Sequence, residues 1–372
     1  NGGFLANQLK GMDYEVYDRT GDIYCIFYEM GAKILTKNGS LCFITSNKWL
    51  KSGYGKNLRK FFSNFNPKIL IDLGANVFTS VSVDTNIMLL ENTNNMNSLE
   101  VASIKNSISN LHVIFSKEKS PYENINENSW FIGTKTEIAL KKKIEKAGLP
   151  LKKHNIKIYR GILTGLTEAF IINKETYKNI VDKDPNSVEI LKPLLRGRDI
   201  NKYYNSWAGL YLIKTDYDID VPRLYPAVYE HLLKYEDKAK KRGDKGKNWW
   251  NLRPCVYYDE FEKDKIVWSD ISNKPSFDWI NGGVYFNNTA YMITGGSKFL
   301  LGVLNSKVVE WIFPKIATDL GENGTRYFKQ FVEEIPIPLM ESKKIEELVD
   351  QVLKIKKENP TEDIRHLEYK ID

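Results

Sequence analysis

The chain has 372 residues, which leaves room for two domains, and its 42% hydrophobic and 27% charged residues are typical of a globular protein. No apolar run approaches the ~20 residues that span a bilayer, and no signal pattern stands at the start. The 3 cysteines and 4 histidines are too scattered for a disulfide framework or a zinc site. The net charge of +7 permits nucleic-acid binding without requiring it, and we expect a cytoplasmic protein.

The first strongly patterned stretch predicts a helix followed by a strand. Apolar residues at helical spacing indicate an amphipathic helix over about 22–37, and we expect Ile26, Met30 and Ile34 to lie in the core. Residues 41–45 form a short, continuous apolar run. Such a run is typical of a strand that is buried on both faces.

A loop of basic and aromatic residues follows this strand. In open α/β sheets, ligands bind outside the carboxyl ends of the strands, so residues 45–55 are the first candidate site. Lys48, Lys51 and Tyr54 suit phosphates and base faces, which predicts contact with a nucleic acid. The alternative is a solvated loop that Trp49 anchors in the core.

Two more strands are predicted over 68–73 and 81–90, with a turn at 76–79 between them. The pair could form an antiparallel hairpin at the edge of the sheet. Phe78 in the turn either packs on this sheet or serves a separate function.

A polar, charged segment at 116–129 reads as a linker, and a basic helix follows at 137–146. Beyond it, Arg196 and Arg198 flank Gly197 in a short turn. Arginine is well suited to bidentate contact with guanine or phosphate, so both are candidate DNA contacts. The alternative is that they form structural salt bridges with nearby acids such as Asp199.

The strongest charge bias lies in residues 231–253, where eight basic and three acidic residues accompany two glycines and two tryptophans. Charge runs are usually solvated faces, but glycines among lysines beside tryptophans favour a loop that tracks DNA. The candidate contacts in this segment are Lys240, Lys241, Arg242, Lys245, Lys247 and Trp249.

The last part of the chain alternates strand, turn and helix signals. Arg326 and Lys329 are candidates for contact with backbone phosphate. The run Ile335-Pro336-Ile337-Pro338 is extended by proline geometry and marks a boundary. Apolar spacing then predicts a helix over 345–355 and a shorter one over 364–371.

Two groups of phrases carry a resemblance to a known family. GDIYCIFYE, NGSLCFITSNKWLKSGYGKNLRKFF and NVFTSVSVDTNI resemble the rear half of a gamma-class (TaqI-type) adenine-N6 DNA methyltransferase, as found in type IIG restriction-modification enzymes. IKIYRGILTGLTEAFII and VEILKPLLRGRDINKYY resemble the target-recognition domain of the same enzymes.

The resemblance implies an α/β fold in three parts. These are the rear half of a Rossmann-like methyltransferase sheet over 1–128, a mixed α+β target-recognition domain over 129–335, and a C-terminal helical tail over 336–372. The implied cofactor of the full-length protein is S-adenosylmethionine, and the implied partner is double-stranded DNA. We expect a monomer without metal.

The resemblance also assigns two aromatic residues. Phe27 matches the position whose ring lines the adenine pocket of the cofactor, although an aromatic there is often only core. Phe78 matches the aromatic that stacks on the flipped-out adenine. Such stacking is needed because an enzyme cannot reach the exocyclic N6 while the base lies inside a duplex.

The family's Gly-rich strand-to-helix turn and its Asn-Pro-Pro-Tyr motif are absent from this sequence. We therefore expect a C-terminal fragment that is inert alone, binds no S-adenosylmethionine, and needs the missing N-terminal part of the same polypeptide. A DNA-binding specificity subunit is the alternative, but it would have no use for residues 21–90. A nuclease is a third, and the sequence shows no convincing carboxylate cluster for one.

Overall fold

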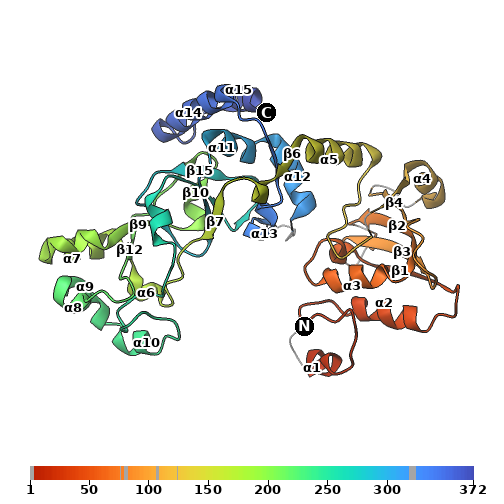
Figure 1. Ribbon diagram of the computed structural model, residues 1–372, viewed down its shortest axis with the longest axis horizontal. Helices are drawn as coiled ribbons and strands as arrows, with labels where there is room; N and C mark the ends of the chain where they lie inside the picture. Colours follow the sequence, from red (N-terminus) through yellow and green to blue (C-terminus); the bar gives the residue numbers. More distant parts are fainter. Residues whose placement is uncertain (1–3, 76, 79–82, 106–108, 124, 318–323) are drawn as a thin grey trace. The chain divides into compact units, whose positions relative to one another are not determined.

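The computed structural model describes residues 4–75, 77–78, 83–105, 109–123, 125–317 and 324–372 (Figure 1). The chain divides into two compact units, Asn1–Lys146 and Ala147–Asp372, called unit 1 and unit 2 below.

Unit 1 is built on a five-stranded sheet with the order β1-β3-β2-β4-β5. The strands are β1 (Ser40–Ser46), β2 (Asn66–Gly74), β3 (Thr85–Glu91), β4 (Glu100–Ser103) and β5 (Ser120–Pro121). Strand β3 runs antiparallel to β1 and to β2, while β2 and β4 are parallel. Strands β1, β2 and β4 therefore point the same way, and β3 is reversed among them.

The predicted antiparallel pairing of the second and third strands is confirmed, but the predicted edge position is wrong. β3 lies between β1 and β2, and β2 is flanked in turn by β4. Sequence pattern cannot place a strand within a sheet, because it reports which faces are apolar and not which neighbour pairs with which edge. The predicted turn at 76–79 falls partly outside the described residues, although Phe78 is described.

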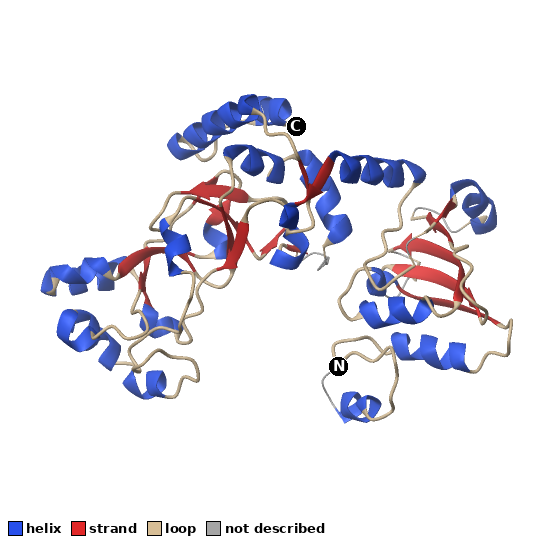
Figure 2. Ribbon diagram, viewed as in Figure 1, coloured by secondary structure: helices blue, strands red, loops and turns tan. Residues whose placement is uncertain are grey.

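Helices precede, connect and follow the strands of this sheet (Figure 2). They are α1 (Phe4–Lys10), α2 (Tyr24–Lys33), the 3-10 turn η1 (Asn47–Leu50), α3 (Gly55–Phe62), α4 (Leu111–Glu118) and α5 (Lys135–Ala147). The core of unit 1 centres on Trp49, which meets Phe62 and Trp130 edge to face with ring centroids 5.1 and 5.4 Å away.

The side of α2 that packs inward is not the one that we expected. Cys25, Tyr28 and Ala32 are buried, whereas Met30 is 48% exposed and Ile34 is 84% exposed. The expectation of core packing holds for Ile26 and is wrong for Met30 and Ile34. Two apolar faces were available on this helix, and only the partner elements decide which one is covered. The exposed side carries a line of apolar residues, called the α2 stripe below: Ile23, Phe27, Met30 and Ile34.

Strand β1 is also less covered than its sequence predicts. Cys42 and Ile44 are exposed, while Leu41 and Phe43 on the other face are partly buried against the core. The expectation that this strand is buried on both faces is therefore wrong within the described residues. β1 lies at the end of the strand order and pairs there with β3 alone.

Unit 2 contains two four-stranded sheets, ordered β16-β9-β12-β8 and β15-β13-β17-β7, and three two-stranded pairs, β10-β11, β14-β18 and β19-β6. The strands are β6 (Gly148–Pro150), β7 (Lys157–Arg160), β8 (Ile171–Ile172), β9 (Leu191–Leu195), β10 (Ile200–Asn201), β11 (Tyr204–Asn205), β12 (Leu210–Ile213), β13 (Lys265–Ser269), β14 (Ile271–Ser272), β15 (Phe277–Ile280), β16 (Tyr285–Phe286), β17 (Ala290–Thr294), β18 (Thr325–Arg326) and β19 (Pro336–Pro338).

The helices of unit 2 cover these sheets. They are α6 (Thr167–Phe170), α7 (Lys174–Lys183), α8 (Val221–Leu224), α9 (Pro226–Leu233), α10 (Glu236–Lys240), α11 (Lys298–Leu304), α12 (Lys307–Ile316), α13 (Lys329–Val332), α14 (Lys343–Glu358) and α15 (Arg365–Ile371). Five short 3-10 turns occur along the described residues, including η4 (Gly197–Asp199).

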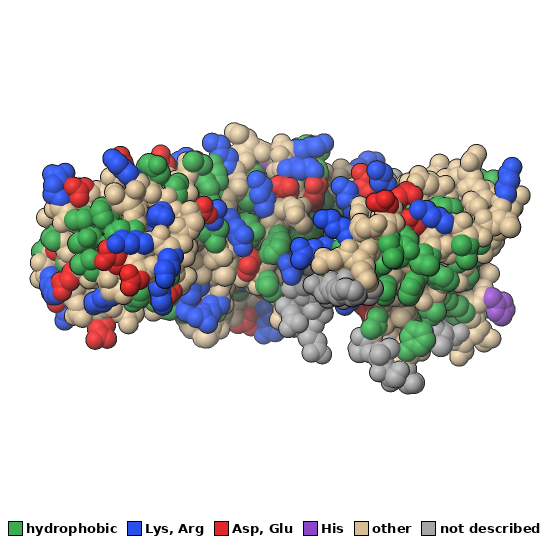
Figure 3. All heavy atoms as spheres, turned by 90° about the horizontal axis from the view of Figure 1, so that it is seen from below, with side chains coloured by type: hydrophobic (Ala, Val, Ile, Leu, Met, Phe, Trp, Pro, Cys, Tyr) green, Lys and Arg blue, Asp and Glu red, His purple; other side chains and the backbone are tan. Residues whose placement is uncertain are grey.

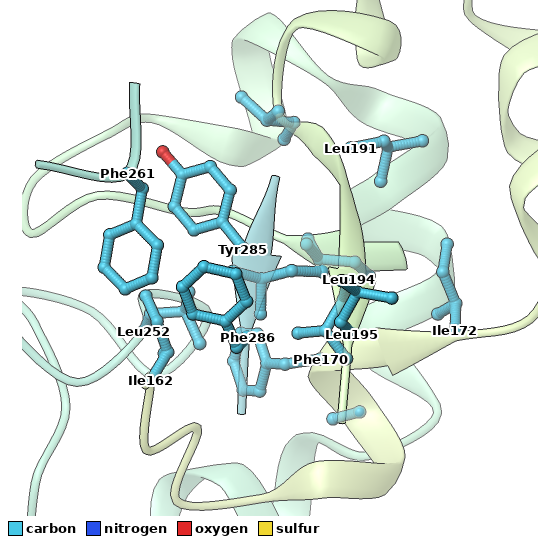
Figure 4. Close-up of a cluster of buried hydrophobic side chains, with 14 of the residues drawn as sticks. Ile162, Phe170, Ile172, Leu191, Leu194, Leu195, Leu252, Phe261, Tyr285 and Phe286 are labelled. Carbon is cyan, nitrogen blue, oxygen red and sulfur yellow. The ribbon is translucent and has the colours of Figure 1, made fainter. Parts of the chain in front are cut away.

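Unit 2 has two hydrophobic cores. The first surrounds β9 and β16, where the rings of Phe261 and Tyr285 stack with centroids 4.6 Å apart and Phe170, Leu194 and Phe286 fill the space beside them (Figure 4). Figure 4 shows these side chains converging from separate segments of the chain. Both cores contain several aromatic side chains, while other apolar residues of unit 2, such as Val256 and Met340, are exposed.

The last two helices belong to the second core. Val349 of α14 is fully buried and lies against Gly302 of α11, where an added Cβ would stand 2.9 Å from a methyl group of Val349. Glycine at 302 thus allows α11 and α14 to approach closely. None of the helices in the described part of the chain combines the length and the hydropathy that a membrane crossing requires.

Candidate nucleic-acid interface

The loop that follows β1 is tied down by its own polar residues. The Ser46 side chain caps η1 by accepting a hydrogen bond from the backbone N–H of Lys48 at 3.3 Å. Trp49 is completely buried, as the alternative interpretation of this loop expected. Lys48 is exposed, and Lys51 is half-buried. The loop is therefore anchored at Trp49 while Lys48 points to solvent.

Three strand ends are linked at this edge of the sheet. The Asn47 side-chain amide, just after β1, donates to Asp72 near the end of β2 at 2.8 Å. Lys105, just after β4, forms an ion pair with the same carboxylate at 3.7 Å. Since β1, β2 and β4 point the same way, this edge gathers their carboxyl ends, where open α/β sheets bind ligands.

Tyr54 is bound to another tyrosine. Its hydroxyl lies 2.9 Å from that of Tyr24 on α2, and the bond links the loop to that helix. Burial, followed by the bond between the two hydroxyls, raises the pKa of Tyr24 well above its usual value, and burial raises the pKa of Tyr54. Both hydroxyls are therefore protonated at neutral pH, so Tyr54 offers a neutral hydroxyl.

Neither of the two singled-out phenylalanines belongs to the core. Phe27 on the α2 stripe is 49% exposed, and Phe78 after β2 is 45% exposed. Each ring is therefore about half exposed and about half covered by the protein.

The two arginines of the turn at η4 differ. The Arg196 guanidinium donates to both carboxylate oxygens of Asp199, at 2.9 Å from Nε and 2.8 Å from Nη2. Burial alone would raise the pKa of Asp199, but the hydrogen bonds from Arg196 outweigh it and lower this pKa. Arg198 is exposed. Arg196 therefore forms the structural salt bridge with Asp199 that was the alternative to DNA contact, while Arg198 is exposed to solvent.

The same turn is also fixed by a close contact between Gly197 and Thr289. The backbone N–H of Gly197 donates to the Thr289 hydroxyl at 2.8 Å, and an added Cβ at 197 would lie 2.4 Å from the Thr289 carbonyl oxygen. Only glycine fits this approach. Arg198 is thus carried by a rigid turn.

Arg242, expected among the DNA contacts, has a structural role instead. It is 8% exposed, and its guanidinium lies over the Phe170 ring. It donates to the carbonyl oxygens of Thr164 and Ala239, and to those of Trp249 and Asn251 at 2.7 Å each. With its donors occupied by the backbone, this guanidinium is not available to a phosphate.

The lysines around Arg242 lie outside. Lys240 forms an ion pair with Glu236 at 2.7 Å, and Lys245 donates to the Arg242 carbonyl at 3.0 Å. Lys241 and Lys247 are exposed. Trp249 is half-buried between Tyr229 and Trp250, at ring-centroid distances of 5.8 and 5.5 Å. The segment is therefore a folded loop that displays lysines around one buried arginine.

A further charged group gathers at the end of β13, and two of its members were not singled out in the sequence. Arg326 lies over Phe328 at 5.1 Å, and exposed Lys329 begins α13. Arg160 of β7 lies over Tyr291 at 5.7 Å, and Asp270 is half-buried next to this group. Arg160 stands at the end of β7, directly before Gly161.

Figure 3 shows one face of the molecule, on which patches of hydrophobic side chains and interspersed basic and acidic side chains lie over both units. Within the ranges that the structure describes, no group of three or more His, Cys, Asp or Glu side chains is placed to hold a metal ion.

Comparison with known families matches both units. Residues 3–78 match the Eco57I restriction-modification methylase family, and residues 192–337 match the TaqI-like C-terminal specificity domain. The methylase match covers the α2 stripe and the loop after β1, and the specificity match covers η4, the basic segment and Arg326. The resemblance to TaqI-like type II adenine methyltransferases that the motifs indicated is thereby confirmed.

Relatives that align with most of the chain are also type II methyltransferases. The chain is 24% identical over 359 residues to the type II methyltransferase M.BstVI of Geobacillus stearothermophilus, covering 87% of this chain and 62% of that protein. It is 23% identical over 360 residues to M.PaeR7I of Pseudomonas aeruginosa, covering 90% and 61%. The chain thus spans about three fifths of the length of these curated relatives.

Among solved structures, the fold is similar to that of the type IIL restriction-modification enzyme MmeI, which was determined in complex with DNA. The TM-score is 0.58 at 14% sequence identity, covering 92% of this chain and 46% of MmeI. At this identity the similarity describes the fold, a mixed α/β arrangement with several sheets.

Proposed function

We propose that this chain, which joins a restriction-modification methylase segment to a TaqI-like specificity domain, recognises DNA and positions the target base in a site-specific adenine-N6 DNA methyltransferase. The observation that carries the proposal is the order of the two family matches along one chain, each within its own compact unit. The full-length protein transfers a methyl group from S-adenosylmethionine to adenine N6. The resemblance to type IIG restriction-modification enzymes also implies a restriction nuclease fused to the methyltransferase.

The sheet of unit 1 is, in this proposal, the rear half of a Rossmann-like methyltransferase sheet. Strands β1 and β2 point the same way and are connected through α3, which is the crossover that parallel strands require. A doubly wound sheet binds its ligands beyond the carboxyl ends of such strands. The linked residues Asn47, Asp72 and Lys105 lie at that edge.

Phe78 follows β2 at the same edge and is the proposed stacking partner of the flipped adenine. A half-exposed ring is accessible for stacking on a base, and each base–aromatic stack contributes about 1–3 kcal/mol. Lys48 and Lys51, after β1, are the proposed phosphate contacts beside it, with Tyr54 supplying a neutral hydroxyl.

In unit 2 the proposed phosphate contacts are the basic side chains that remain outside: Arg198, Lys240, Lys241, Lys245, Lys247, Arg326 and Lys329. Contacts of this kind orient a protein on duplex DNA and carry no sequence information by themselves. Arg196 and Arg242 support this surface from within, since Asp199 and backbone carbonyls occupy their donors. Trp249 backs the basic loop by packing on Trp250.

Phe27 is the residue of this chain that would contact S-adenosylmethionine, which supplies the methyl group when bound. Its ring is half-exposed and fits stacking on an adenine. The Gly-rich turn and the Asn-Pro-Pro-Tyr motif are absent from the sequence. We therefore predict that the isolated chain shows no binding of S-adenosylmethionine in calorimetric titration, and micromolar affinity would contradict this.

We also propose that a further segment of the same polypeptide covers the α2 stripe and the outer edge of β1. Four apolar side chains stand exposed in and beside α2, which makes an uncovered apolar surface, and Ile44 on the opposite face of β1 is 45% exposed. Exposed patches of this kind mark interaction sites. The curated relatives, being longer than this chain, have the additional residues for such a cover.

Sequencing of modified adenines in genomic DNA tests the function. Cells that carry the full-length gene should methylate adenine at one reproducible motif, and cells with the gene deleted should lack that pattern. The same genomic pattern in both strains would contradict the proposal. A motif methylated at cytosine would contradict the assignment to adenine N6.

A further inference from the structure

Three charged side chains of unit 2 meet around the exposed end of β13, β17 and β7. In the register of this sheet, Tyr291 of β17 pairs with Arg160 of β7 on one side and with Trp268 of β13 on the other. Asp270 follows β13 directly, and Arg326 pairs with its neighbour Ile271. Strands β7, β13 and β18 thus bring Arg160, Asp270 and Arg326 to one place from distant parts of the chain.

Both arginines are oriented by aromatic rings. Arg160 lies over Tyr291 at 5.7 Å, and Arg326 lies over Phe328 at 5.1 Å. The two rings are themselves in contact, with centroids 6.3 Å apart. A guanidinium held on an aromatic face loses little further freedom when it binds a ligand, so both arginines are preorganised.

Arg160 is fixed more tightly than Arg326. Its Nε donates to the Asn288 carbonyl oxygen at 2.8 Å. In the described part of the chain this is the one hydrogen-bond acceptor of the guanidinium, and the side chain is exposed. The terminal nitrogens of Arg160 therefore remain for a partner outside the protein.

Asp270 is held through its backbone. Its N–H donates to the Thr289 carbonyl at 2.9 Å, and its carbonyl accepts from the N–H of Tyr327 at 2.9 Å. Partial burial raises the pKa of Asp270, and the nearby Arg160 and Arg326 act against that rise. No ion pair joins this carboxylate to either arginine among the described residues, so its oxygens are not consumed by a salt bridge.

A carboxylate beside arginines is a poor site for phosphate alone, because the negative charge repels the ligand. It is a good site for the edge of a G·C base pair in the major groove. Guanine presents two acceptors there, O6 and N7, which the terminal nitrogens of an arginine can bind together. Cytosine presents the N4 amino donor, which a carboxylate accepts.

We propose that Asp270 and Arg160 form a base-reading pair that recognises one G·C base pair in duplex DNA. Arg160 donates to guanine O6 and N7, Asp270 accepts from the cytosine N4 amino group, and Arg326 holds the adjacent phosphate. This inference rests on the proposed function and adds to it the residues that read sequence. The exposed lysines elsewhere in unit 2 supply affinity without this discrimination.

Selection from a randomised duplex library with the whole chain tests the pair. Asp270→Asn keeps the shape of the side chain but adds a donor, and asparagine is suited to adenine N6 and N7. The variant should lose its preference for cytosine at one position and tolerate adenine there. The ratio of selected cytosine to selected adenine at that position should fall by about 5–150-fold, equivalent to about 1–3 kcal/mol. Arg160→Gln should relax the preference for guanine at the same base pair.

Two controls separate base reading from other roles. Asp259→Asn changes an exposed carboxylate of the same unit and should leave the selected motif unchanged. Lys329→Gln should weaken all sequences alike. Both test variants should retain the wild-type urea transition, and Arg160→Gln, on an exposed side chain, carries the test if Asp270→Asn is unstable.

The outcomes are distinguishable. Unchanged motifs in both test variants, uniform weakening across all sequences, or changes at two different base pairs would overturn the base-reading pair while leaving DNA recognition intact. If the wild-type chain selects no duplex at all, the proposed function itself fails.

Discussion

Unit 1 and unit 2 both bury apolar cores and both expose some apolar residues, but they differ in where the exposed ones gather. Unit 2 closes two aromatic-rich cores, and its terminal helices α14 and α15 pack into one of them. Unit 1 closes a core around Trp49 but leaves the α2 stripe and one face of β1 exposed. The α2 stripe is a row of apolar side chains on one helix, which is the observation behind our proposal that a further segment covers unit 1.

The units also differ in how charge is used. In unit 1, polar residues converge on one sheet edge, through Asn47, Asp72 and Lys105. In unit 2, arginines are divided between internal supports and exposed contacts, as Arg196 and Arg198 illustrate. A basic residue therefore cannot be assigned as a DNA contact by its charge alone. Its hydrogen-bond partners within the protein decide whether its donors are available to DNA.

The largest expected effect tests whether the two units are independent. Trp49→Ala removes a fully buried side chain from the core of unit 1 and should destabilise that unit by about 3–5 kcal/mol. The unfolding transition of unit 2 should not move. Trp207→Ala, at a 43% exposed tryptophan of unit 2, is the matched control and should cost less than about 1 kcal/mol. A parallel shift of both transitions for Trp49→Ala would show a single cooperative unit.

The next effect concerns the basic loop of unit 2. Changing Lys240, Lys241, Lys245 and Lys247 together to Gln should weaken duplex binding for every sequence. Each lost phosphate contact flattens the slope of log K against log salt by about 0.9, so the slope should fall by several units. Affinities measured at four salt concentrations give the slope.

Arg242→Gln is the contrasting variant for that loop. It leaves backbone carbonyls without their buried donor and should lower the stability of unit 2, while its own charge contributes no phosphate contact. Arg253→Gln, in an exposed ion pair with Asp244, should leave the stability nearly unchanged. An unaltered salt slope in the lysine variant would identify the loop as a solvated face.

A smaller effect is expected at Phe78 of unit 1. In the full-length protein, Phe78→Ala should slow methylation of duplex DNA by roughly 5–150-fold, which corresponds to the about 1–3 kcal/mol of a base–aromatic stack. Its stability should change little, because the ring is 45% exposed. Methylation at the wild-type rate would assign Phe78 no role in holding the base.

The smallest effect tests the uncovered stripe. Met30→Gln with Ile34→Gln should change the stability of the isolated chain by less than about 0.5 kcal/mol, since both side chains are exposed. The same pair should destabilise the full-length protein, in which we propose that the stripe is covered. Equal urea midpoints for wild type and variant in both forms would show that nothing covers α2.

Local pattern was enough to find several elements of this protein. The helix around Ile26, the strand at Phe43 and the glycine-arginine turn at Gly197 all occur where spacing and turn residues predicted them. The family motifs were equally readable, because they are contiguous phrases. These features depend on residues within a few positions of one another, which is why a single sequence suffices.

The candidate site was only partly predictable, because basic residues of the same charge have different environments in the structure. Lys241 and Arg242 are neighbours with the same charge, yet one is exposed and the other donates to carbonyl oxygens as far away in sequence as Thr164. Asp270 had no distinguishing context in the sequence. Its importance follows from Arg160 and Arg326, which approach it through strand pairing.

The sequence by itself thus determined several helices and strands of unit 1, the last two helices, and the families that the chain resembles. Tertiary structure alone decided that β3 lies inside the sheet, that Met30 faces outward, and that Arg242 supports the loop from within. The physical reason is that periodicity records which side of an element is apolar, whereas burial and hydrogen bonding depend on partners far along the chain.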